Sequence, residues 1–117
     1  MYVLSFDCAN RSLSVCYMYV DETHKFNPIN MDVNNPAVTV KFVDVYDLTK
    51  GEKSNTIERA IALKQCVSNI DSKLQSKPDK VLIEYQMSAN DKSRCVFNQL
   101  VYHYSDTAVI VGPSLKN

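Results

Sequence analysis

The chain has 117 residues, which is the size of one domain with a single hydrophobic core. Its 13 basic and 13 acidic residues cancel, which argues against a protein that binds nucleic acid through a uniformly positive surface. With two glycines in the sequence, the glycine-rich loops that wrap phosphates in P-loop and dinucleotide-binding proteins are excluded.

The four cysteines form no C-x-x-C pair, and no histidine stands at zinc-ligand spacing from them. No secretory signal is predicted, because Asp7 and Arg11 interrupt the apolar start, and no apolar stretch reaches membrane-spanning length. We therefore expect an intracellular protein whose reduced thiols pack as small hydrophobic side chains, with no membrane partner.

The amino-terminal part of the chain predicts three strands. Tyr2 to Asp7 is almost continuously apolar, which is typical of a strand covered on both faces. Leu13 to Val20 is rich in β-branched and aromatic residues, and the short turn before it predicts an antiparallel hairpin. After a polar loop, Val38 to Leu48 predicts a third strand. Its alternation places four side chains on one face: Val38, Val40, Phe42 and Asp44.

Helices and strands alternate in the rest of the chain. Apolar residues recur at helical spacing before Pro78, and Asn55 is the expected cap of this helix. Its expected apolar stripe consists of Ile57, Ala60, Ile61, Leu63, Val67, Ile70 and Leu74. Val81–Tyr85 predicts a buried strand, Ser93–Tyr104 a second helix and Thr107–Val111 a fifth strand.

The resulting order, β-β-β-α-β-α-β, predicts the α/β class: a mixed five-stranded sheet with helices on its faces. Because β-α-β crossovers are right-handed, the strand at Val81–Tyr85 should run parallel to the first strand and lie beside it.

Two acidic residues stand at the ends of these expected neighbours. Asp7 ends the first strand, and Glu84 lies near the end of the fourth. The carboxyl ends of parallel strands form ligand sites at one edge of an α/β sheet. Close carboxylates repel each other and attract a cation, and oxygen ligands suit Mg²⁺ or Mn²⁺. Such a site can cleave phosphodiesters, so both acids are candidate catalytic metal ligands.

Each acid also has a structural interpretation. Asp7 can cap a turn, and Glu84 can pair with a buried lysine or arginine. Their joint placement at the ends of two predicted central strands favours a metal site over either role taken alone.

Three segments share one pattern. Ser5 to Leu13 has the sequence SFDCANRSL, Val81 to Asn90 has VLIEYQMSAN, and Val109 to Lys116 has VIVGPSLK. They resemble the first-strand motif, the second acid-bearing strand and the following strand of RuvC-type, ribonuclease H-like resolvases, especially the poxvirus Holliday junction resolvases. The element order matches across essentially the whole chain. The family usually has glycine at the position of Ala9.

This resemblance implies a ribonuclease H-like, magnesium-dependent endonuclease that acts as a homodimer on four-way DNA junctions during viral genome processing, at cytoplasmic replication sites of the host cell. It implies metal-binding roles for Asp7 and Glu84 and a catalytic role for Lys116. The family's remaining acids lie on a helix after the fifth strand and have no matching positions here. We therefore expect residues 1–117 to form one domain that is incomplete at its carboxyl end and nearly inactive as a nuclease.

DNA contacts are expected around the same edge: Arg11, Met87, Ser88, Asn90, Lys92 and Arg94. The basic residues would neutralise phosphates, and Met87 would act as an apolar wedge against unstacked bases. The alternatives are solvated surface charge, core packing of Met87, and helix capping by Ser88 and Asn90.

Dimer contacts are expected on the second helix, which has more apolar surface than one sheet face is expected to cover: Phe97, Leu100, Val101 and Tyr104. The resembling family uses the equivalent helix in its dimer, and an isologous contact fits a two-fold substrate.

Three hypotheses for function follow. The leading one is a junction-resolving endonuclease. The second is a non-catalytic ribonuclease H-like module that binds DNA or dimerises, which the zero net charge and Ala9 favour. The third is a nucleotide-phosphate-handling domain of the same fold, against which the lack of glycine-rich loops argues.

Overall fold

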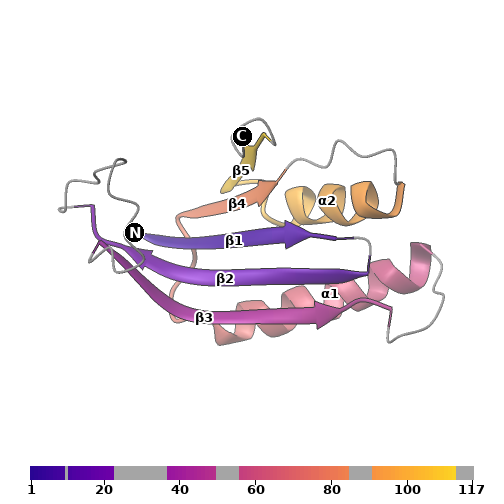
Figure 1. Cartoon of the computed structure of the whole chain (residues 1–117), viewed down its shortest axis with the longest axis horizontal. Coiled ribbons are helices and arrows are strands. Elements are labelled where there is room, and N and C mark those ends of the chain that lie inside the picture. Colours follow the sequence, from indigo (N-terminus) through magenta and orange to yellow (C-terminus); the bar gives the residue numbers. More distant parts are fainter. Residues whose placement is uncertain (10, 23–36, 50–55, 85–90, 113–117) are drawn as a thin grey trace.

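The computed structural model describes the chain except residues 10, 23–36, 50–55, 85–90 and 113–117, and the side chains of residues 56 and 91–93 (Figure 1). The elements are β1 (Tyr2–Cys8), β2 (Ser12–Val20), β3 (Val38–Asp47), α1 (Thr56–Lys73), β4 (Lys80–Glu84), α2 (Asp91–His103) and β5 (Ala108–Val111). The predicted order and fold class are confirmed.

The strands form one five-stranded sheet in the order β3-β2-β1-β4-β5. β1 pairs antiparallel with β2 and parallel with β4, and β5 runs parallel to β4. The expected parallel neighbours β1 and β4 are therefore side by side at the centre of the sheet, because the crossover through α1 returns the chain next to its first strand.

Both helices pack on the same face of the sheet. Leu4 and Phe6 of β1 and Ile83 of β4 join buried side chains of α1 and α2 in one core cluster. Burial of this apolar surface is the main force that holds the helices to the sheet. Of the helices in the described part of the chain, none is long and apolar enough to cross a membrane.

The buried stripe of α1 is narrower than predicted. Leu63, Val67 and Ile70 are buried in the core, whereas Ile57 is 71% exposed and Ile61 is 54% exposed. The two isoleucines follow the apolar spacing of the sequence but lie on the outer side of the helix.

The prediction for the faces of β3 is wrong beyond Val40. Val40 pairs with Met18, yet Phe42 pairs with Tyr17, so Lys41 is an extra residue in a β-bulge. A bulge reverses the alternation of side chains after it. Phe42 therefore packs against the core side, together with Asp44, while Val40 lies on the opposite face.

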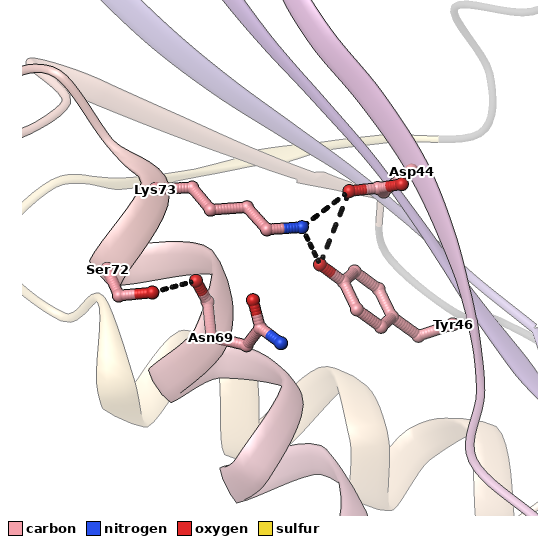
Figure 2. Close-up of polar contacts among 5 residues, drawn as sticks. All are labelled: Asp44, Tyr46, Asn69, Ser72 and Lys73. Carbon is pink, nitrogen blue, oxygen red and sulfur yellow. Dashed lines mark hydrogen bonds and ion pairs between the residues drawn. The ribbon is translucent and has the colours of Figure 1, made fainter.

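A polar contact ties the end of α1 to β3 (Figure 2). Lys73 Nζ donates to Asp44 Oδ2 at 3.1 Å and to the Tyr46 hydroxyl at 3.5 Å. These hydrogen bonds raise the pKa of the Lys73 ammonium. Because both side chains of this ion pair are exposed, the contact orients the helix end rather than adding much stability.

The second face of the sheet is open within the described part of the chain. Val43 and Val45 of β3 and Val109 of β5 are exposed there. The expectation that β1 is covered on both faces is met only in part: on this second face Val3 is buried, whereas Asp7 at the carboxyl end of the strand is exposed.

Candidate metal centre at the carboxyl edge of the sheet

Strand register brings the two predicted acids together. Phe6 is the register partner of Ile83 in the parallel pair β1–β4, so Asp7 and Glu84 are the next residues along the two strands. Because Phe6 and Ile83 both point into the core, the following residues both point to the open face. Neighbouring strands lie about 4.8 Å apart, which places the two carboxylates within reach of one cation.

A pocket of about 310 Å³ surrounds the pair. Its lining residues are Ser5, Phe6, Asp7, Leu82, Glu84, Val111 and Gly112. The carboxylates and the Ser5 hydroxyl supply oxygen atoms, and Leu82 and Val111 supply an apolar floor. The pocket is therefore polar on the side of the acids and apolar on the side of β5.

The negative charges of both acids affect the pKa of the Cys8 thiol. Burial, the charge of Asp7 and the charge of Glu84 together raise the pKa of Cys8 to about 12. A thiolate at Cys8 is therefore disfavoured at neutral pH, and the thiol is no candidate for a nucleophile or a soft-metal ligand.

The donor set fits a hard divalent cation. Asp7 is exposed and Glu84 is half-buried on the same face, so both carboxylates are accessible from solvent. Carboxylate oxygens are the ligands that Mg²⁺ and Mn²⁺ prefer. Among the described residues, no group of three or more His, Cys, Asp or Glu side chains is arranged to hold a metal, so this pair is the set that these residues offer.

A larger pocket of about 360 Å³ lies away from these acids, near the carboxyl ends of α1 and α2. There Asp71 accepts hydrogen bonds from the Tyr104 hydroxyl and interacts with His103 Nε2, both at 2.9 Å. These contacts join the two helix ends. The smaller pocket is the candidate functional site because it holds the paired carboxylates at the strand edge where ligands bind in α/β sheets.

The predicted DNA contacts are placed only in part. Arg11 is exposed in the turn after β1, where its carbonyl accepts a hydrogen bond from the Leu48 amide at 2.9 Å. Arg94 is exposed in α2, and Lys92 belongs to the first turn of the same helix. The other expected contacts and the expected catalytic lysine lie outside the described residues: Met87, Ser88, Asn90 and Lys116.

The predicted dimer residues are placed differently than expected. Phe97, Leu100 and Tyr104 are buried in the core of the single chain, and Val101 is half-buried against it. The assumption that the sheet could not cover this helix was wrong, because β1 and β4 and the flank of α1 together bury these side chains. The exposed apolar residue of α2 is Tyr102, which is 85% exposed.

No protein-family model matches the sequence, and no curated protein matches it. Solved structures do match. The RuvC of Thermus thermophilus in complex with a Holliday junction substrate has a TM-score of 0.68 at 14% identity, over 97% of this chain and 67% of that chain. The fowlpox virus resolvase in complex with Holliday junction DNA has a TM-score of 0.64 at 13% identity, over 100% of this chain and 64% of that chain. This chain has the ribonuclease H-like fold.

A protein named for a different family also matches. A Ppx/GppA family member from Aquifex aeolicus has a TM-score of 0.54 at 10% identity, over 99% of this chain and 36% of that chain. The fold therefore accounts for the position of the site without naming its reaction. This chain spans about two thirds of the length of the resolvases it matches.

Two serines on the open face of this fold were not predicted from the sequence as site residues. Ser5 lines the pocket, and Ser14 is the register partner of Asp7 in the hairpin of β1 and β2. The signal was present in the sequence, because residues two apart share a strand face and a short hairpin fixes the partner of each residue.

Proposed function

We propose that this chain contains the ribonuclease H-like fold and the first metal ligands of a metal-dependent endonuclease. The enzyme would act on four-way DNA junctions. The observation that carries the proposal is the juxtaposition of Asp7 and Glu84 at the carboxyl edge of β1 and β4. The structural likeness to two resolvases supports the choice of substrate, and the likeness to the fowlpox virus protein supports a role in viral genome processing in the host cytoplasm.

The two carboxylates would hold Mg²⁺ or Mn²⁺. A divalent cation in this place supplies a Lewis acid for phosphodiester hydrolysis. The carboxylates themselves keep the cation at the strand edge, and the apolar floor of Leu82 and Val111 limits water on one side of it.

Positive charge lies at the same end of the molecule as the acids despite the zero net charge. Arg11 is exposed in the turn that follows β1. Both helices begin at the end of the molecule to which β1 points (Figure 1), and helix amino termini have partial positive charge. A phosphate backbone can therefore approach this edge although the acids repel it.

The experiment compares a labelled four-way junction with a linear duplex of the same sequence. In Mg²⁺, the chain should bind the junction at least about tenfold more tightly than the duplex, as measured by fluorescence anisotropy. Any cleavage of the junction should require Mg²⁺ and both acids. Equal affinity for junction and duplex would contradict the proposed substrate, and a non-catalytic module would bind the junction without binding Mg²⁺.

We also propose that two copies associate through the outer side of the helices. Ile57 and Ile61 on α1 and Tyr102 on α2 are the large apolar residues exposed there. The helices are neighbours, since Gln99 Nε2 donates to the Ala60 carbonyl at 2.9 Å. A two-fold contact at this surface would give the two sites that symmetric cleavage of a junction needs.

Ile61→Glu should convert this dimer to monomers. In a two-fold contact each copy contributes the same residue, so the substitution would bury two unpaired negative charges in one interface. Light scattering measures the change. Val45→Glu is the matched control, since Val45 is also apolar and exposed but lies on the open face of the sheet. An unchanged mass for Ile61→Glu, or the same loss in both variants, would refute the helix surface.

A further inference from the structure

Ser14 belongs to a row of side chains that crosses the open face at the level of the acids. In strand order the row consists of Val45, Ser14, Asp7, Glu84 and Val111. Its centre is polar and its ends are apolar. Ser14 flanks Asp7 on the side away from Glu84, so one neutral hydroxyl adjoins the proposed cation site.

The register fixes how close Ser14 lies to the acid. Directly opposed residues of antiparallel strands have Cβ atoms about 5 Å apart and share a face. Leu13 and Val15, on either side of Ser14, are buried in the core, which confirms that the Ser14 side chain points to the open face with Asp7.

The hydroxyl of Ser14 is available to a ligand. The side chain is half-buried, and none of the hydrogen bonds found among the described residues uses its hydroxyl. No buried side-chain polar atom in the described part of the chain lacks a partner, so this hydroxyl reaches solvent.

We propose that the Ser14 hydroxyl binds a non-bridging phosphate oxygen of the DNA strand held at the cation site. The proposal rests on the proposed function, and it adds a substrate contact on the β2 side of Asp7. A serine hydroxyl donates a hydrogen bond to phosphate and is a common backbone contact in protein–DNA complexes.

Charge explains why a neutral donor suits this position. A lysine or arginine beside Asp7 would pair with its carboxylate and compete with the divalent cation. A hydroxyl has no charge with which to displace the cation, yet it still donates to the phosphate. The two flanking valines offer no donor, so Ser14 is the donor that this row provides to a strand crossing the sheet.

The experiment measures two affinities in the full chain. Magnesium binding is measured by calorimetry without DNA, and junction binding by anisotropy in Ca²⁺, whose looser coordination than that of Mg²⁺ disfavours cleavage. Ser14→Ala should weaken junction binding about ten- to a hundredfold, as expected for one hydrogen bond to a charged group, and leave magnesium affinity within about twofold of the wild type.

Two further variants separate this role from a structural one. Ser14→Thr keeps the hydroxyl and the preference for a strand, so it should restore most of the junction affinity. Ser105→Ala is the matched control, because Ser105 is exposed in the turn before β5, outside both helices and outside the row, and its loss should change neither affinity.

The outcomes distinguish this proposal from the proposed function. If Ser14→Ala binds the junction as the wild type does, or loses magnesium and junction affinity together, Ser14 makes no phosphate contact. The proposed function would stand in both cases, provided that the wild type binds Mg²⁺ and prefers the junction. A wild type that binds neither ligand would overturn the proposed function and the Ser14 contact with it.

Discussion

Asp7→Asn should reduce the affinity of the chain for Mg²⁺ by at least about a hundredfold. Replacing a carboxylate that contacts a cation removes both a ligand and a negative charge, whereas loss of an outer-shell partner alone costs about 10- to 100-fold. Glu84→Gln should have a similar effect, since its side chain lies next to that of Asp7 on the adjacent parallel strand. Calorimetry at constant ionic strength measures both variants.

The control for this pair is Asp106→Asn. Asp106 is an exposed acid in the turn before β5, outside the residues that line the carboxylate pocket. The substitution Asp106→Asn changes the net charge by the same amount as Asp7→Asn, so it tests whether net charge alone alters cation binding. Magnesium binding that survives in Asp7→Asn, in a protein with wild-type circular dichroism, would exclude the metal centre.

Leu100→Ala should lower the free energy of unfolding by about 2–5 kcal/mol. Leu100 is fully buried between α2 and the sheet, and the substitution leaves a cavity that the core cannot close. Urea unfolding monitored by circular dichroism, at concentrations where the chain is monomeric, gives this value.

Tyr102→Ala is the matched control on the same helix. Tyr102 is 85% exposed, so its truncation should change the unfolding free energy by about 0.5 kcal/mol or less. If Leu100→Ala changes the free energy of unfolding as little as Tyr102→Ala does, Leu100 is not a core residue. Its predicted role as a dimer contact would then be favoured.

The arrangement of strands could be predicted because local patterns and chain topology agree. The apolar runs of β1 and β4, the short turn between β1 and β2 and the right-handed crossover leave few alternatives for the sheet. The same reasoning predicted that Asp7 and Glu84 meet at one edge, because it needs only strand direction and alternation.

The exposure of helix residues could not be predicted from spacing alone. Ile57 and Ile61 have the spacing of a core stripe but face outward, and Leu100 faces inward although it was assigned to an interface. Apolar spacing marks one side of a helix, and how much of that side is buried depends on the width of the sheet beneath it. The faces of β3 were missed because a single inserted residue, Lys41, leaves no clear mark in the sequence.

That inserted residue has a consequence for solubility. β3 has ten residues and is an edge strand of the described sheet, with a row of backbone groups that none of the described strands pairs with. Long regular edges can recruit the edge of another molecule and begin a fibril. The bulge at Lys41 interrupts the regular ladder and puts a positive charge near its middle, so that a second copy cannot extend the sheet without leaving hydrogen bonds unmade.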